Sequence, residues 1–146
     1  MTAIPFIRST ISTDENAILA LLEELENRVF DTAVFTEIFQ TYLADSRTLM
    51  KVAIAEDDRI CGFISCKGQP LLHHEGLVFE IQELIVTSDH QGRGIGKKLI
   101  ESLKPELLRL GAKSLEVTSN KRRKEAHAFY QSVGFLNSHE KFTIYF

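Results

Sequence analysis

A glycine-rich turn between an apolar strand and a helix is the feature that most limits what this chain can fold into. The turn, Gln91-Gly92-Arg93-Gly94-Ile95-Gly96, follows a strand predicted over residues 77–86 and opens a helix with regularly spaced apolar residues. The first amides of a helix lack partners within it, and the helix dipole adds about half a positive charge there. Glycine lets the backbone approach a ligand closely, because no Cβ intervenes. The pattern predicts a phosphate or pyrophosphate site at residues 91–96.

Two other phosphate-binding motifs do not fit this turn. A P-loop requires GxxxxGK followed by Ser or Thr, whereas Gln91 stands five before Gly96 and Lys97 is followed by Lys98. A dinucleotide fingerprint requires GxGxxG close to the first strand, but this turn reads GxGxG and follows the fourth predicted strand. A different anion-binding family is therefore indicated.

The other elements are predicted in the order β-α-α-β-β-β-α-β-α-β, which is typical of a mixed sheet covered on both faces. A capping box at Ser12–Glu15 is expected to begin the first helix. Two helical stripes are expected to be buried, namely Ile18, Leu21, Leu22 and Leu25, and then Phe35, Ile38, Phe39 and Leu43. The loop is expected over residues 69–76 and the other helices over residues 32–44, 95–110 and 124–132, with Pro105 bending the third helix near Glu101. Strands are expected over residues 6–8, 50–56, 60–66, 77–86, 115–118 and 142–146.

Composition excludes several classes of protein. The chain has 146 residues, 44% of them apolar and 25% charged, with a net charge of −3, so it lacks the basic excess of a nucleic-acid-binding domain. No apolar run approaches the roughly 18 residues of a membrane span, and no signal peptide is recognisable, so a cytoplasmic location is expected. One domain over residues 1–146 is expected, because no linker or repeat divides the chain. Cys61 and Cys66, on opposite faces of a predicted strand, are expected to be free thiols.

The glycine turn matches Q/R-x-x-G-x-G/A, the acetyl-CoA signature of the GNAT N-acetyltransferases, and the chain resembles that family over nearly its whole length. The strand over residues 81–86, Asn120, Phe129-Tyr130 and Gly134-Phe135 carry the resemblance together with the turn. The resemblance implies an α/β fold with a mixed, mostly antiparallel sheet, splayed parallel central strands and helices on both faces. It also implies acetyl-CoA as the cosubstrate.

A closer similarity is to the bacterial aminoalkylphosphonate N-acetyltransferases. It rests on Leu72-His73-His74, Glu80–Leu84, Thr118–Asn120 and Ala126–Tyr130. In this fold the segment between the first two helices, Phe30 to Phe35, shapes the acceptor pocket. The glycine turn has the sequence typical of the whole family. The resemblance therefore supports the fold more firmly than it supports the identity of the acceptor.

Acetyl transfer to an amine requires a base for the ammonium proton and an acid for the leaving thiolate. Glu80 and Glu83 lie on the strand before the turn, on opposite faces unless a bulge re-aims one of them. By resemblance Glu80 holds the position of the family's general base. Glu83 is expected to bind substrate or to be the alternative base. Tyr130 would be a core aromatic by spacing alone, but the resemblance makes it the proton donor.

The resemblance assigns the cosubstrate to the end of this strand, the glycine turn and one residue beyond: Leu84, Ile85, Val86, Gln91, Gly92, Arg93, Gly94, Ile95, Gly96, Lys97 and Asn120. A backbone amide near Leu84–Val86 is expected to stabilise the oxyanion. The basic run Lys121–Lys124 is either a solvated loop or a contact for CoA phosphates or an anionic acceptor. His74 is expected in the acceptor pocket, and no metal is expected, because adjacent histidines lack ligand spacing.

Together these residues predict an acetyl-CoA-dependent N-acetyltransferase acting directly on the primary amine of a small molecule, with an aminoalkylphosphonate as the first candidate. The alternatives are a protein, peptide, polyamine or amino sugar acceptor and, from another class, a sensor that binds acyl-CoA without turnover. Neither nucleic acid nor a membrane is expected as a partner. The exposed sheet edges of this fold could pair two chains into a homodimer.

Overall fold

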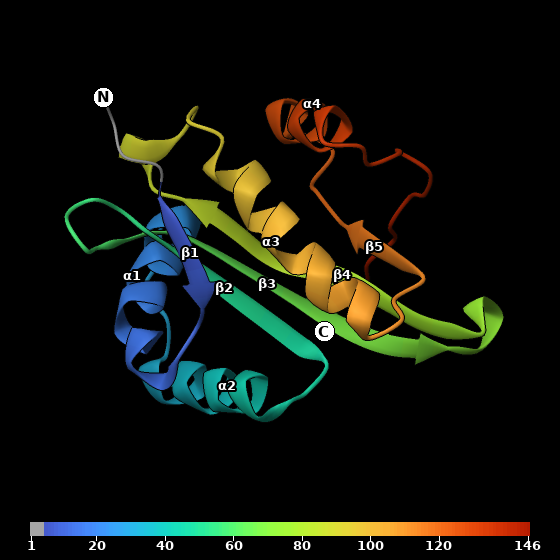
Figure 1. Cartoon of the computed structure of the whole chain (residues 1–146), viewed down its shortest axis with the longest axis horizontal. Coiled ribbons are helices and arrows are strands. Elements are labelled where there is room, and N and C mark those ends of the chain that lie inside the picture. Colours follow the sequence, from blue (N-terminus) through green and yellow to red (C-terminus); the bar gives the residue numbers. More distant parts are fainter. Residues whose placement is uncertain (1–4) are drawn as a thin grey trace.

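A five-stranded mixed sheet with helices on both faces organises the chain (Figure 1). The structure is a computed structural model and describes residues 5–146. The strands follow one another in chain order across the sheet, antiparallel except for the parallel pair β4 and β5. The elements are β1 (Phe6–Ser9), α1 (Glu15–Glu26), α2 (Thr32–Ala44), β2 (Thr48–Ile54), β3 (Ile60–Leu71), β4 (Gly76–Val86), α3 (Ile95–Arg109), β5 (Ser114–Val117) and α4 (Lys124–Ser132).

The hairpin of β3 and β4 is longer than the sequence predicted. The expected loop over residues 69–76 is mostly strand, because the pairing continues through Gln69↔Val78 and Pro70↔Leu77 to the end of β3. A short 3₁₀ turn at Leu72–His74 then reverses the chain. This extension places the two histidines at the far tip of the hairpin (Figure 1).

The predicted final strand over residues 142–146 is wrong. The chain after α4 has no regular structure, and Phe142, Ile144 and Phe146 are exposed. Their alternation favours a strand, but a strand also needs a neighbour to satisfy its backbone groups. The pairs of β5 in the described residues are with β4 alone, so the last segment has no ladder.

The first helix begins differently from the predicted capping box. Asp14, and not the expected Glu15, supplies the carboxylate that reaches back, since it accepts the Ile11 N–H at 2.9 Å. The same carboxylate accepts two hydrogen bonds from Arg8, at 2.8 and 2.9 Å, which hold the pKa of Asp14 below its usual range. This pair ties the start of α1 to β1.

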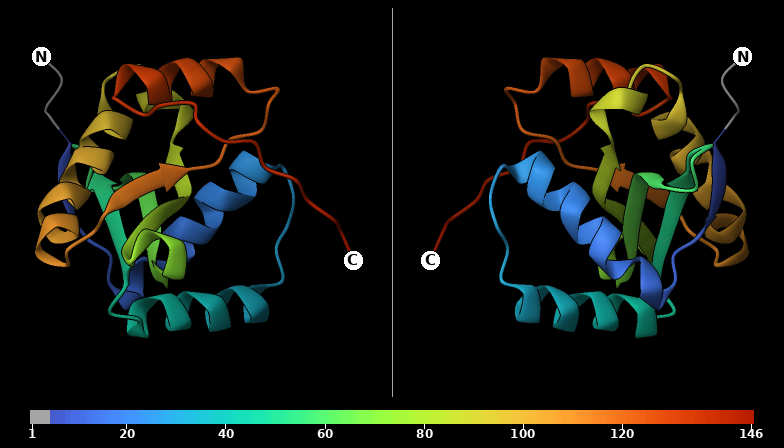
Figure 2. Two further views of the ribbon diagram at one scale, coloured as in Figure 1. Left: turned by 90° about the vertical axis from the view of Figure 1, so that its right-hand side faces the viewer. Right: turned by 90° about the vertical axis from the view of Figure 1, so that its left-hand side faces the viewer.

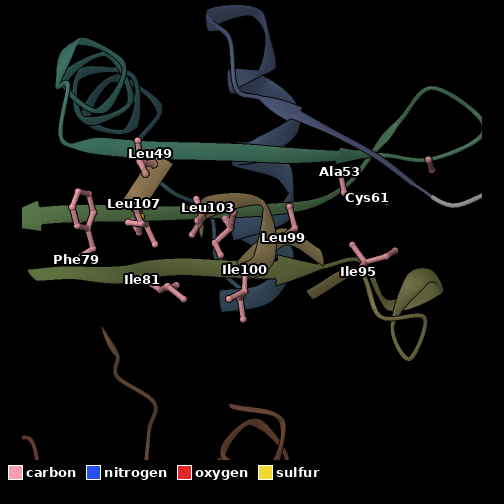
Figure 3. Packing of buried hydrophobic residues seen from close by; sticks show 13 residues of the cluster. Leu49, Ala53, Cys61, Phe79, Ile81, Ile95, Leu99, Ile100, Leu103 and Leu107 are labelled. Atoms are coloured by element: carbon pink, nitrogen blue, oxygen red, sulfur yellow. The ribbon is translucent and has the colours of Figure 1, made fainter. Parts of the chain in front are cut away.

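Helix α3 covers one face of the sheet with a fully buried stripe, as its spacing predicted. Leu99, Leu103 and Leu107 point into the space between α3 and the strands (Figure 3). The helix runs on through Pro105 to Arg109. Cys61 and Cys66 are buried free thiols, as predicted. Both belong to the core cluster under α3, and not to opposite faces of the sheet as expected.

Helices α1 and α2 cover the other face less completely. Ile18, Leu21, Leu22 and Phe39 are buried as predicted, whereas Leu25, Ile38 and Leu43 are exposed and Phe35 is only partly buried. The expected burial of the two stripes is therefore correct only where they touch the sheet. Within residues 5–146, no helix is long and apolar enough to cross a membrane.

Candidate active site

A cleft of about 650 Å³ lies between helices α1 and α2 and the face of the sheet that they cover. Figure 2 shows α1 crossing this face, with α2 further along it and a connecting segment that swings away from the sheet. The walls come from both helices, from the middle of β4, and from the ends of β5 and α4. Three lining side chains carry the chemistry discussed below, namely Glu83, Arg123 and Tyr130.

A bulge in β4 decides which carboxylates reach this face. Glu83 pairs with Ser65 and Ile81 pairs with Cys66, so Gln82 is an extra residue on β4. Phe79 and Ile81 pack with the α3 core before the bulge, whereas Leu84 and Val86 pack against it afterwards. The parity of the strand therefore switches at Gln82. Glu80 and Glu83 share the face opposite α3, instead of the opposite faces that strict alternation predicts.

Of the two β4 carboxylates, Glu83 is the one that lines the cleft. It accepts a hydrogen bond from the Ser65 hydroxyl, and the same hydroxyl accepts the Glu83 backbone N–H at 3.1 Å. Burial raises the pKa of Glu83 against the opposing effects of the Ser65 hydrogen bond, the Lys67 charge and the Tyr42 hydroxyl. A raised pKa suits a carboxylate that must take a proton from an ammonium near neutral pH.

Glu80 and His74 lie outside the residues that line the cleft. Glu80 lies three residues before Glu83 on β4, opposite Lys67 on β3, with Gln82 Nε2 at 3.5 Å from its carboxylate. His74 is exposed at the tip of the hairpin, where its ring contacts that of His73 at 4.3 Å. The roles predicted for these two residues stay predictions, and the geometry brings Glu83 closer to the cleft than either.

Tyr130 reaches the cleft from α4. Its ring packs against Phe129 and Phe135, with centroids 5.4 and 5.7 Å away. Burial raises the pKa of Tyr130, and the charge of Arg123 opposes this rise. The hydroxyl therefore stays protonated at neutral pH, which is the state that a proton donor requires.

The glycine turn has the backbone geometry of an anion site. Gly92 and Gly94 have φ values of 77° and 78°, a left-handed conformation that glycine adopts without strain. A Cβ built at either position meets nothing within 4 Å, so the turn is open. Gly94 is the N-cap of α3, whose first amides face outward. Gln91 donates from Nε2 to the Val86 carbonyl at 3.2 Å and fixes the turn to the end of β4.

The parallel strands separate just before this turn. Pairing of β4 with β5 ends at Ile81↔Val117, while β4 continues to Val86. The edge of β4 over Leu84–Val86 therefore has no β5 partner, as expected for splayed central strands. On this side, β5 therefore takes none of the backbone groups of Leu84–Val86.

Asn120 and the basic run lie on the loop between β5 and α4. The side-chain oxygen of Asn120 accepts the Arg122 N–H at 2.9 Å. The backbone carbonyl oxygen of Asn120 lies 2.8 Å from His127 Nε2. Asn120 thus shapes the loop before α4. Of the four basic residues, Arg123 lines the cleft, whereas Lys121 lies 3.9 Å from Glu140.

Sequence reasoning missed Tyr42 and Ser65. Tyr42 comes from α2, and burial together with Glu83 raises its pKa to about 12. Lys67 Nζ lies 4.5 Å above its ring. Ser65 is fully buried in the middle of β3. A lone hydroxyl within an apolar strand was a signal for Ser65, but no pattern in the sequence pointed from Tyr42 to Glu83.

Comparisons with known proteins agree with this geometry. The sequence model of the acetyltransferase (GNAT) family matches residues 16–135. The aminoalkylphosphonate N-acetyltransferase of Salmonella typhimurium strain LT2 is 32% identical over 137 residues, covering 94% of this chain and 88% of that protein.

Solved structures share the fold at lower identity. A crystal structure described as a transcriptional regulator from Bacillus halodurans C-125 has a TM-score of 0.89 at 22% identity and covers 98% of this chain and 100% of that one. Glucosamine-6-phosphate N-acetyltransferase from Arabidopsis thaliana has a TM-score of 0.82 at 21% identity, with 99% of each chain covered.

The fold, with its splayed strands and glycine turn, is that of an acyltransferase. The chain belongs to the acetyltransferase (GNAT) family. It is an acetyl-CoA-dependent N-acetyltransferase, as the sequence predicted. The open glycine turn, the free edge of β4, and the adjacent basic Arg93 and Lys97 fit the phosphates and the thioester arm of acetyl-CoA, which supplies the acetyl group.

Proposed function

We propose that this enzyme transfers acetyl directly to the primary amine of a small anionic molecule, with an aminoalkylphosphonate as the first candidate. The observation that carries the proposal is the pairing of Glu83 and Tyr130 in one cleft, next to the cationic side chain of Arg123. The relative from Salmonella typhimurium, an aminoalkylphosphonate N-acetyltransferase, supports this acceptor class.

Glu83 is the proposed base. An alkylamine with a pKa of about 10.4 is almost wholly protonated at neutral pH, so it must lose a proton before it can attack. Glu83 accepts that proton, directly or through a water, and burial has raised its pKa toward the range that this transfer needs. Glu80, which the family resemblance favours, lies outside the cleft lining and serves as the comparison in the tests below.

Tyr130 is the proposed acid. As the new C–N bond forms and the C–S bond breaks, the departing thiolate needs a proton. A tyrosine at its ordinary pKa of about 10 gives a proton to a thiolate whose thiol pKa is about 8.5 at a cost of roughly 2 kcal/mol, and the raised pKa of Tyr130 adds to this cost. Amides of Leu84–Val86, free of β5, are the proposed donors to the developing oxyanion.

Arg123 is the proposed partner of the acceptor's anionic group. It lines the cleft and lies close enough to Tyr130 to influence its pKa. A guanidinium presents paired N–H donors that match phosphonate oxygens. An acceptor would then lie with its amine toward Glu83 and its anion toward α4.

An amine panel tests the proposal. Purified enzyme with acetyl-CoA receives 2-aminoethylphosphonate, propylamine, spermidine, glucosamine and a lysine peptide, while thiol release and acetylated product are measured. We expect the highest kcat/KM with the aminophosphonate. A higher value with the peptide, polyamine or sugar would replace the acceptor class, and tight CoA binding without any turnover would indicate a sensor.

A matched pair of variants sharpens the panel. Arg123→Ala should raise KM for 2-aminoethylphosphonate by about tenfold, since a charge-assisted hydrogen bond contributes roughly 1.5–3 kcal/mol, and should leave propylamine unchanged. Lys121→Ala removes a charge of the same run outside the cleft and should change neither substrate. Equal effects of both variants would contradict a specific anion contact.

A further inference from the structure

One row of side chains on α2 leads away from Glu83 along the cleft. Val34, Ile38 and Tyr42 are spaced four residues apart, so they lie on one face of the helix. Tyr42 stands next to Glu83 at one end of the row. Val34 lies eight residues earlier, which is about 12 Å along the helix axis. All three line the cleft.

This row is apolar and open. Val34 is 52% exposed and Ile38 is 51% exposed, and Leu25 of α1, which lines the same cleft, is 48% exposed. Phe35, partly buried, fills the wall between them. Exposed apolar side chains that converge on one cavity mark a binding surface, whereas isolated ones are ordinary.

The row itself carries no charged side chain, and Asp31 lies at its N-terminal end, where its Oδ1 accepts the Val34 N–H at 3.0 Å. Glu83 lies at the Tyr42 end. The other charged lining residues are on the N-terminal side of α2 or on the opposite wall: Glu26, Arg28, Asp31 and Arg123. The Arg28 guanidinium lies 4.2 Å from the centre of the Phe30 ring, so its charge is placed over an aromatic face. A polar or polycationic acceptor would leave the apolar wall facing water.

The volume of the cleft also favours an acceptor with an apolar part. About 650 Å³ is within the range of sites that enclose a drug-sized ligand, and such sites are lined mostly by apolar groups with a few polar ones that orient the ligand. An amine at Glu83 and an anion at Arg123 occupy only part of this space. The remainder is available to a non-reacting part of the acceptor.

We infer that the natural acceptor carries an apolar alkyl or aryl body, which packs along Val34 and Ile38 while its primary amine lies at Glu83. The inference rests on the proposed function and narrows its substrate class to amines with a hydrophobic substituent several carbons long. The wall then contributes affinity through burial of that substituent and orients the amine toward the catalytic end.

Two chain-length series test this inference. The first is 1-aminoalkylphosphonates with alkyl groups from methyl to hexyl, and the second is the matching n-alkylamines without the phosphonate. We expect kcat/KM to rise by up to roughly fourfold per methylene before it levels off at the end of the wall. Binding of the same compounds, measured by calorimetry on the enzyme saturated with CoA, should follow the same trend without depending on turnover.

Two variants assign the effect to the wall. Val34→Ser and Ile38→Ser replace half-exposed side chains, so both should fold, and each should flatten the dependence of kcat/KM on chain length. Val29→Ser is the matched control, because Val29 is 88% exposed between α1 and α2 and does not line the cleft. It should behave like the wild type.

The outcomes separate the two proposals. Turnover without any chain-length trend, or a trend that both wall variants retain, overturns the inference and leaves the acetyltransferase proposal standing. A chain-length trend in binding without turnover of any amine supports the apolar wall and contradicts the proposed function. A change of oligomeric state in Ile38→Ser, measured by light scattering, would show that the wall contacts another chain and would overturn the inference.

Discussion

The two faces of the sheet are packed to different degrees. On one face, α3 buries an unbroken stripe, in which Leu99 and Leu103 are fully inaccessible (Figure 3). On the other, α1 and α2 bury Ile18 and Phe39 at the sheet but leave Leu25, Val34 and Ile38 about half exposed. Both faces are built from amphipathic elements with the same kind of apolar spacing. The second face encloses the cleft that Glu83 lines.

This difference separates stability from chemistry. The α3 face is dry and has the properties of a core, where each buried methyl group contributes to the free energy of unfolding. The α1–α2 face gives up some burial and gains a space in which Glu83, Tyr42 and Ser65 interact in low dielectric. Substitutions on the two faces should therefore change different measurements.

The largest expected effect is the loss of activity in Glu83→Gln on the cleft face. Removing a general base should lower kcat/KM by about 10² to 10⁴. Glu80→Gln is the matched control on the same strand, and we expect it to change kcat/KM less than severalfold, because Glu80 does not line the cleft. A larger loss in Glu80→Gln would return the base to the position favoured by the family resemblance.

The same variant should show how the burial of Glu83 makes the free energy of unfolding depend on pH. Folding raises the pKa of Glu83, so the folded state binds this proton more tightly than the unfolded state. The resulting contribution to stability is complete below the ordinary pKa of 4.5 and is lost as pH rises through the folded pKa. Urea unfolding should therefore show Glu83→Gln gaining on the wild type as pH rises. A constant difference would contradict a raised pKa.

The next largest effect belongs to the α3 face. Leu103→Ala should lower the free energy of unfolding by about 2–5 kcal/mol, because it removes a fully buried side chain and leaves a cavity. Ile38→Ala, on the cleft face, should cost less than about 1 kcal/mol, since half of its side chain already meets solvent. Urea denaturation measures both. Similar losses of unfolding free energy in the two variants would contradict the difference in packing between the two faces.

A smaller effect on rate is expected for Tyr130→Phe. It should lower kcat by about a hundredfold through loss of the proton donor, and it should leave the Kd for CoA unchanged. The ring packing against Phe129 and Phe135 is retained, so the melting temperature should hold. Unchanged kcat would remove Tyr130 from the chemistry and make it a packing residue.

The smallest expected effect is a shift of the pH profile in Ser65→Ala. The Ser65 hydrogen bond lowers the pKa of Glu83 against the effect of burial, so its loss should raise that pKa further. The acid limb of kcat/KM, which requires ionised Glu83, should then move to higher pH by up to about one unit. Tyr42→Phe should shift it in the same direction by less, since the Tyr42 contribution is the smaller. A merely structural role of either residue would lower activity without moving the limb.

Local patterns in the sequence predicted most of the elements. The glycine turn, the stripe of α3 and the bounds of α2 and α4 followed from spacing and turn residues, because each depends on contacts close in the chain. The final strand was wrong because Phe142–Phe146 has strand-like alternation but no strand beside it. Alternation alone cannot supply a backbone partner.

The site was predicted in part, for a related reason. The sequence named Tyr130, Glu83, Gln91 and the glycines as candidates, since they belong to motifs of fixed spacing, and Glu83 only as a substrate-binding residue or alternative base. The preference for Glu80 rested on the family resemblance. The expectation that Glu80 and Glu83 lie on opposite faces depended on strict alternation along β4, which the bulge at Gln82 interrupts. Nothing in the strand's own residues marks the bulge, because it is defined by the pairing with β3.

The sequence by itself determined the family, the anion-binding turn and the helical stripe that forms the core, because these are encoded by residue type and periodicity over short distances. The tertiary structure decided which carboxylate faces the cleft, placed Tyr42 and Ser65 beside it, and left the wall at Val34 and Ile38 open. Those features arise where segments far apart in the chain meet. They depend on strand register and on helix placement, which no local pattern specifies.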